Sequence, residues 1–222
     1  MKHFQNYLSL CVISLLFMWA NKAFLLSENV YFNSLADQFT YEQIEDFIAQ
    51  GKKWEWLSYA IIPVVYLIKF TLVALVLSIG TWFITERYVF KPFFGAAIVA
   101  EFVFLLPVLF KMGWFLFVQT SYTLQDLQFF YPLSALNLFE REALEPWLVY
   151  PLQLLNVFEV VSWVVLAYQV APFVVARGEV QQQEEESFFE RSGRGLGVVL
   201  PSYGTGLIIW VALVMFLTIS YT

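Results

Sequence analysis

The stretch PWLVYPLQLLNVFEVVSWVVLAYQVAPFVVARG, residues 146–178, decides the fold. A hydrocarbon core of ~30 Å is crossed by about 20 mainly apolar residues in a helix, and this run is longer than that. It nevertheless carries Gln153, Asn156 and Glu159 at or near membrane depth. Because lipid offers no hydrogen-bond partners, these side chains must face protein or trapped water. The stretch therefore predicts a membrane helix that lies inside a bundle.

The composition indicates an integral membrane protein. Of the 222 residues, 60% are hydrophobic and only 14% are charged, whereas soluble proteins are about a quarter charged. We expect an all-α, polytopic membrane helix bundle that forms a single domain over residues 1–222, with five transmembrane helices. Their expected positions are about 7–26, 56–83, 93–118, 147–174 and 196–218.

The first apolar run has two interpretations. Residues 7–26 follow Lys2 and resemble a secretory signal peptide, but a cut after Ala20 would place Met18 where a small residue is needed. We therefore expect an uncleaved anchor. A short helix should follow, because Thr40 and Gln43 form a capping box, and Gly51 is expected to close it.

The connectors have distinct characters. Residues 120–145 are too apolar for a solvated loop, and they predict an interfacial segment, part-helical after Pro132, between the third and fourth spans. Pro63 and Pro107 predict kinks inside the second and third spans. Residues 181–186 favour a solvated helix, and residues 191–195 suggest a flexible basic turn.

The positive-inside rule orients the chain only weakly. With the N-terminus inside, six basic residues fall on the cytoplasmic side and five fall outside or near that boundary. The short turn at residues 85–92 and the loop after Arg177 hold nearly all the arginines. We therefore expect the N-terminus to be cytoplasmic and the C-terminus to lie outside, in the inner membrane if the source is bacterial.

Three charged side chains are predicted inside the membrane. Each of Lys69, Glu101 and Glu159 costs ~2.5–3.5 kcal/mol or more at the bilayer centre unless it is paired or hydrated. At ~1.5 Å per residue, Lys69 lies about 20 Å below Trp56, and Glu159 lies about 17 Å below Trp147. If both spans start at the same outer interface, these two residues are nearly level and within reach of each other. Glu101, about 12 Å from the inner end of its span, is within reach of the inner interface instead.

Two readings of these charges remain open. One is an ion or proton path; the other is a structural ion pair that fixes helix register or meets a partner subunit. Gln153, Asn156 and Glu159 recur every three residues, so a continuous helix would place them on one face. Such a face is typical of hydrogen bonding between helices.

The residue inventory restricts the chemistry. With one histidine, His3, and one cysteine, Cys11, the chain cannot build a His/Cys zinc site or a Ser-His-Asp triad. The net charge of -6 does not suit nucleic acid. We expect no catalytic residues, no metal and no cofactor, and therefore no enzyme.

The order of features resembles the Yip family of five-span membrane proteins over about residues 91–217. The resemblance rests on Lys91-Pro-Phe-Phe-Gly leading to Leu106-Pro-Val-Leu, on Leu155-Asn-Val-Phe, and on the closing stretch 177–217. It departs at Tyr168-Gln169, where the family has a glycine, and over the first third of the chain. It implies a non-enzymatic protein that binds other membrane proteins and organises the bilayer.

Two functions are therefore expected from the sequence. The first is a non-catalytic integral membrane scaffold or accessory subunit, whose partners are the lipid bilayer and other integral membrane proteins or further copies of itself. The second is a small transporter or permease component that uses Lys69, Glu101 and Glu159. An intramembrane enzyme is disfavoured because Ser162 and Ser202 have no identifiable base.

Overall fold

A computed structural model describes residues 2–140, 144–174 and 186–221, and no β-strand forms in these ranges. The chain folds into α-helices joined by short 3₁₀ and π turns. Their bounds are α1 Lys2–Leu25, α2 Glu28–Leu35, α3 Tyr41–Thr85, α4 Lys91–Glu101, η1 Phe102–Phe104, α5 Leu105–Phe117, α6 Leu124–Phe129, η2 Ala135–Leu138, α7 Pro146–Leu154, α8 Val157–Val170, η4 Ala171–Phe173, α9 Phe188–Val199, η6 Leu200–Gly204 and α10 Thr205–Tyr221.

Four helical stretches are long and apolar enough to cross a membrane: Lys2–Leu25, Tyr41–Thr85, Lys91–Phe117 and Phe188–Ser220. The all-helical class predicted from the sequence is therefore confirmed, and these four stretches are compatible with membrane helices by length and composition. The expected fourth span, 147–174, is not one helix. It is divided into α7 and α8, and the apolar helix Val157–Phe173 is shorter than the other four stretches.

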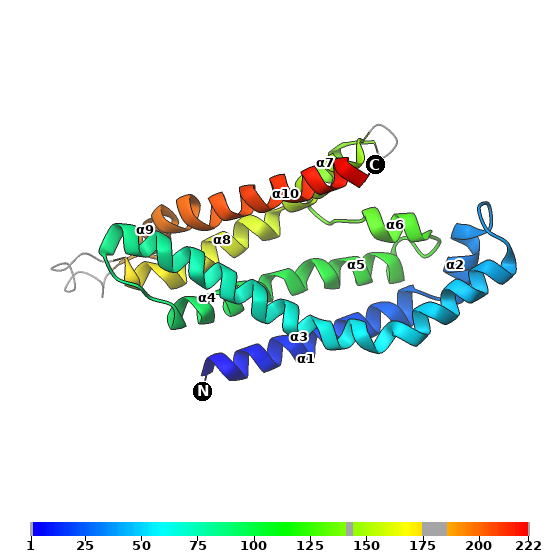
Figure 1. The fold of residues 1–222 in the computed structure, drawn as a ribbon, viewed down its shortest axis with the longest axis horizontal. Helices are drawn as coiled ribbons and strands as arrows, with labels where there is room; N and C mark the ends of the chain where they lie inside the picture. The colour runs from blue at the N-terminus through cyan, green and yellow to red at the C-terminus, as the bar shows by residue number, and fades with distance from the viewer. Residues whose placement is uncertain (1, 141–143, 175–185, 222) are drawn as a thin grey trace.

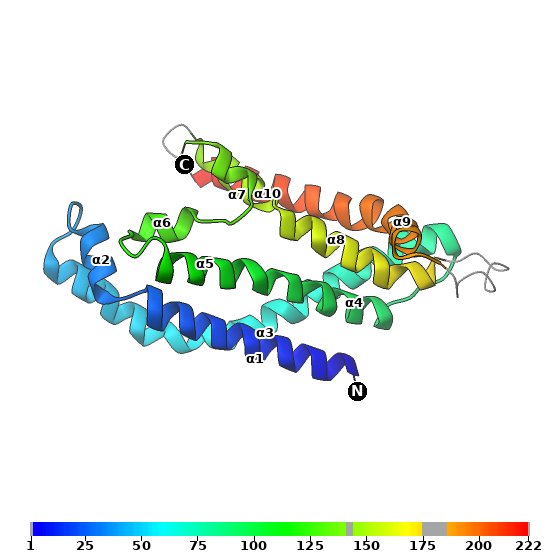
Figure 2. The same ribbon diagram turned by 180° about the vertical axis from the view of Figure 1, so that it is seen from behind.

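The long helices lie side by side along one axis (Figures 1 and 2). The turn between α3 and α4 and the start of α9 lie at one end, toward which the N-terminus also points. The α2 helix, the α6–α7 connector and the C-terminus lie at the other end. Successive long helices therefore run in alternating directions.

The second predicted span and the short helix before it are one continuous helix. The capping box is confirmed, since the Gln43 amide donates to the Thr40 hydroxyl and the Thr40 amide donates to the Gln43 side chain. The prediction that Gly51 ends this helix is wrong. No proline and no left-handed residue follows Gly51 directly, so α3 runs for 45 residues until Glu86, whose φ of 55° ends it.

The third span bends where proline interferes with the helix. Pro107 lacks the amide that would bond to the carbonyl of residue 103, and its ring crowds that carbonyl. The 3₁₀ turn Phe102–Phe104 lies at this position and separates α4 from α5. The predicted irregularity within this span is confirmed.

The apolar connector packs partly on the bundle. α6 starts with a capping box between Thr123 and Asp126, and the predicted helical piece after Pro132 is the 3₁₀ turn η2. Leu127 and Leu136 are buried, whereas Leu138 is 82% exposed. The connector therefore covers the bundle with one side and leaves an apolar side open.

The expected flexible basic turn at residues 191–195 is wrong. Ser187 and Glu190 form a capping box that starts α9, and the Arg191 guanidinium lies 4.0 Å from the centre of the Tyr168 ring. This cap starts the last long helix before the predicted position 196. The expected helix at 181–186 falls mainly on residues outside the described ranges.

The largest core forms where α8 and α9 meet α3 and α4, around Ala74, Phe93, Leu166, Ala167 and Val198. Gly195 of α9 permits a very close approach to α8. A Cβ placed on Gly195 would lie 1.9 Å from the Ala167 backbone oxygen. Backbone cannot move away as a flexible side chain does, so this position requires glycine.

We predict that Gly195→Ala lowers the free energy of unfolding by about 1–3 kcal/mol, because the added methyl group separates α8 from α9. Gly197→Ala is the matched control. It lies on the same helix, meets nothing within 4 Å, and should be neutral or stabilising by up to ~1 kcal/mol through helix propensity. Thermal unfolding of the two purified variants in detergent measures the difference. Equal midpoints would contradict the close packing.

Candidate intramembrane charge site

Lys69 and Glu101 form an ion pair between α3 and α4. The Lys69 Nζ lies 2.8 Å from Oε1 and 2.7 Å from Oε2 of Glu101. Glu101 is only 8% exposed, whereas the Lys69 side chain is 41% exposed and its ammonium group lies 5.0 Å from the centre of the Phe104 ring. One partner is therefore buried and the other reaches the surface of the helix bundle.

The Lys69–Glu159 pair that the depth count allowed does not form, because Lys69 pairs with Glu101. The predicted depths were counted along an unbroken helix, but the chain leaves the helical path at Leu155 and Asn156. In addition, α4 packs directly against α3. Glu101, at the end of α4, consequently meets Lys69 instead.

Glu159 is held by neutral donors. Its Oε1 accepts hydrogen bonds from the Trp163 indole Nε1 at 2.8 Å and from the Tyr203 hydroxyl at 3.1 Å. It is 7% exposed and lies in the first turn of α8, where the helix dipole favours negative charge. Within the described part of the chain, no lysine or arginine forms an ion pair with it.

Asn156 serves the break between α7 and α8. Its Oδ1 accepts from the Glu159 amide at 2.8 Å, and its Nδ2 donates to the Gln153 carbonyl at 2.8 Å. These bonds are local, so the predicted continuous face of Gln153, Asn156 and Glu159 is wrong. The spacing of three places residues on one face only within one helix, and α7 ends at Leu154. The Gln153 side chain instead lines a cavity.

The connector also satisfies the backbone at this break. The Ala135 amide donates to the Leu155 carbonyl at 2.8 Å, and the Val157 amide donates to the Leu133 carbonyl at 3.2 Å. A non-helical backbone is tolerated at membrane depth where protein supplies such partners. The apolar connector is therefore part of the structure that holds the α8 terminus.

Tyr203 was not identified from the sequence. It lies in the π turn Leu200–Gly204, and its ring also meets the Trp163 ring edge-on at 5.8 Å. Pro201 was a signal of irregular backbone, but no pattern in the sequence linked this turn to Glu159. Asn156 three residues before Glu159, by contrast, was a readable helix N-terminus signal.

The buried carboxylates coincide with breaks in helices. Glu101 is the last residue of α4 before η1, Glu159 follows the α7–α8 break, and Tyr203 belongs to the π turn. α8 contacts both α4 and η1, and η6 contacts α3. Each break exposes backbone groups, and side chains from neighbouring elements pack at these positions.

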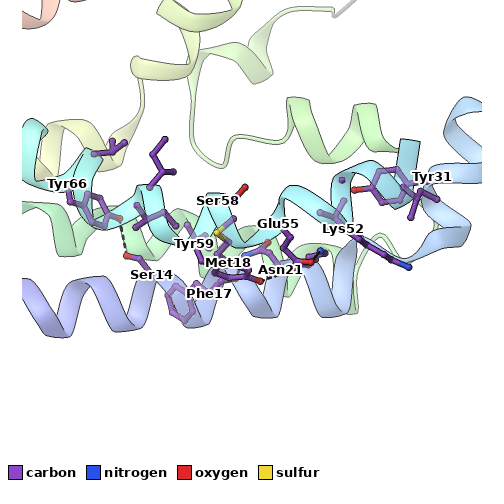
Figure 3. A pocket seen from close by; sticks show the side chains of 18 of the residues that line it. Ser14, Phe17, Met18, Asn21, Tyr31, Lys52, Glu55, Ser58, Tyr59 and Tyr66 are labelled. Atoms are coloured by element: carbon purple, nitrogen blue, oxygen red, sulfur yellow. Dashed lines mark hydrogen bonds and ion pairs between the residues drawn. The ribbon is translucent and has the colours of Figure 1, made fainter. Parts of the chain in front are cut away.

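Two cavities lie closer to the end that carries α2 and α6. The first, about 670 Å³, lies between α1, α3 and the η1–α5 region, and Ser14 and Tyr66 form a hydrogen bond of 2.9 Å at its wall (Figure 3). The second, about 440 Å³, lies between α5, the connector and the α7–α8 break. Lys69, Glu101 and Glu159 line neither of these two cavities.

The first cavity has a charged end. Glu28 pairs with Lys52 at 2.7 Å, and Lys22 pairs with Glu55. The pKa of the exposed Glu28 carboxyl lies below its usual value, because Lys52 donates a hydrogen bond to it and attracts its negative charge. Across the described ranges, no group of three or more His, Cys, Asp or Glu side chains is arranged to hold a metal ion.

The chain is all-helical in its described ranges, and its four long apolar helices are compatible with an integral membrane protein. Comparison with protein-family models, with curated proteins and with solved structures gives no match.

We predict that Lys69→Met lowers the free energy of unfolding by about 1–3 kcal/mol, because it leaves the Glu101 carboxylate buried without a cation. Removing one partner of a fully buried pair costs about 3–5 kcal/mol, and the solvent or lipid exposure of Lys69 reduces this value. The double variant Lys69→Met/Glu101→Gln should recover part of the loss. Thermal unfolding in detergent provides the measurement.

The exposed Glu28–Lys52 pair is the control for this prediction. Glu28→Gln removes an equally short contact at the surface and should leave the unfolding midpoint unchanged. If the effects of Lys69→Met and Glu101→Gln simply added in the double variant, the two side chains would be energetically independent. That result would contradict the ion pair.

Proposed function

We propose that this chain is a non-catalytic integral membrane scaffold or accessory subunit that acts by binding another membrane protein. The observation that carries the proposal is the uneven burial of the Lys69–Glu101 pair. Glu101 is covered by the chain itself, whereas 41% of the Lys69 side chain is open on a helix that is long and apolar enough to cross a membrane. A second protein is the natural cover for this ammonium group.

The cost of leaving Lys69 against lipid supports this reading. The Lys69 ammonium group has three N–H donors, and within the described ranges it donates to the Glu101 carboxylate. Hydrocarbon supplies no further acceptor. Val65 and Leu72, which flank Lys69 on the same side of α3, are 50% and 54% exposed. A partner helix with small residues and one polar acceptor would match this surface.

The resemblance to the Yip family agrees with this proposal. It implies a protein that binds other membrane proteins rather than one that carries out a reaction. The presence of only one histidine and one cysteine in the sequence also favours a protein without a catalytic site. Family membership and the absence of an activity stay predictions.

We further propose five crossings with the N-terminus inside, α7 and α8 together forming the fourth. The alternating directions of α1, α3, α4–α5, α7–α8 and α9–α10 support this arrangement (Figure 1). It places Arg87, Lys91, Arg191 and Arg194 on the cytoplasmic side.

Cysteine labelling tests this topology. In a Cys11→Ser background expressed in a bacterial inner membrane, Gln38→Cys should react with a membrane-impermeant maleimide in intact cells. Tyr88→Cys should react only after lysis, because it lies in the turn at the opposite end of α3. Both positions are exposed, so accessibility within the protein is matched. The reverse pattern would overturn the orientation, and labelling of both in intact cells would overturn the number of crossings between them.

Photo-crosslinking in native membranes tests the partner. We expect a photoreactive amino acid at Val65 or Leu72 to give a protein adduct of higher mass, identified by mass spectrometry. The same probe at Ile208, which is 70% exposed and belongs to α10 rather than α3, is the control and should give mainly lipid adducts. Comparing the adducts at Val65 and Leu72 with those at Ile208 distinguishes a specific helix contact from random collisions in the membrane.

Lipid adducts at all three positions would overturn the scaffold proposal. The alternative is a transporter that uses Lys69, Glu101 and Glu159, and the helix breaks beside both carboxylates are its support. It needs a hydrated path, and neither cavity described above reaches these residues. Ion flux in proteoliposomes that Glu159→Gln abolishes without loss of folded protein would favour this alternative.

A further inference from the structure

The second cavity, about 440 Å³, is lined by both apolar and polar side chains. Phe104, Val108 and Phe158 are among the apolar residues of its lining, and Lys111 and Gln153 are among the polar ones. Pockets for small ligands have about this size and combine hydrophobic lining with a few polar groups. The cavity lies against the connector, near the end of α5, rather than among the buried carboxylates.

Lys111 brings a positive charge to this cavity, and no carboxylate of the described residues forms an ion pair with it. Its Nζ donates a hydrogen bond to the Leu127 carbonyl at the end of α6. An ammonium group has three donors, so two are left for another acceptor. Within the described ranges Lys22, Lys52 and Lys69 each pair with a glutamate, but Lys111 pairs with no acidic side chain.

Neutral donors lie in the same lining. Tyr131, Tyr150 and Gln153 surround the cavity with Lys111. The Tyr150 oxygen accepts from the Trp210 indole at 2.8 Å, which leaves its own O–H free to donate. A ligand oxygen carrying negative charge would therefore find one ammonium group and several neutral donors, with no carboxylate of the described chain lining the cavity.

We propose that this cavity binds a single-chain anionic amphiphile, with a carboxylate or phosphate head group at Lys111 and a hydrocarbon chain along Phe104, Val108 and Phe158. The positive charge of Lys111 favours a negatively charged head group, and the apolar residues of the lining favour a hydrocarbon chain attached to it. Lys111 lies within two turns of the end of α5, where a head group at the membrane boundary is within reach. The proposal is independent of the Lys69 surface.

Oleate titration of the full-length protein in an uncharged detergent, followed by native mass spectrometry, tests this site. We expect one bound oleate, and oleyl alcohol should bind at least about tenfold more weakly because it lacks the charge that Lys111 recognises. Lys111→Met should reduce oleate binding by a similar factor, and Lys111→Arg should retain it. Lys53→Met, which removes an exposed charge on α3, is the control and should bind oleate like the original protein.

Further ligands distinguish the source of the anion. Oleate and a single-chain lysophosphatidic acid should compete for one site, whereas inorganic phosphate should not displace oleate. Equal binding of oleate and oleyl alcohol, or unchanged binding by folded Lys111→Met, would overturn the proposal. Displacement of oleate by inorganic phosphate would overturn the amphiphile and leave a site for soluble anions. The comparison of oleate with oleyl alcohol needs no variant, so it stands even if Lys111→Met fails to fold.

Discussion

The structure depends on one constraint: its polar groups must find hydrogen-bond partners within the protein, because lipid supplies none. Each break in a membrane helix frees backbone groups, and lipid cannot satisfy them. At the α7–α8 break, the Asn156 side chain and the backbone of the connector supply these partners. The apolar connector therefore supplies hydrogen-bond partners to the backbone between α7 and α8.

The same constraint explains how the charges are distributed. Glu159 is satisfied by Trp163 and Tyr203, and Glu101 is satisfied by Lys69, so both carboxylates are provided for within the chain. Lys69 and Lys111 are the exceptions, because their ammonium groups retain donor capacity toward a surface or a cavity. Glu101 and Glu159 therefore have their hydrogen-bond partners within the described chain, whereas Lys69 and Lys111 keep N–H groups available for a further acceptor. Both proposals follow from that asymmetry.

The sequence predicted what depends on local chemistry. Apolar length gave the helical membrane class, the Thr40–Gln43 pair gave the start of α3, and Pro107 gave the irregular third stretch. The identity of the Lys69 partner depended on which helices pack together, and no local pattern contains that information. The predictions for Gly51 and for residues 191–195 were wrong for a related reason. Helix-forming neighbours continue α3 through Gly51, and the Ser187–Glu190 capping box starts α9 before residue 191.

The 45-residue length of α3 has a structural consequence. At about 1.5 Å per residue it measures roughly 68 Å, more than twice the ~30 Å thickness of a hydrocarbon core. One end of this rod carries Lys52 and Glu55, and Lys69 lies further along it. Pro63 lies between Glu55 and Lys69, yet the helix continues through it, so the ion pairs near the start of α3 and the Lys69–Glu101 pair are carried by one continuous helix.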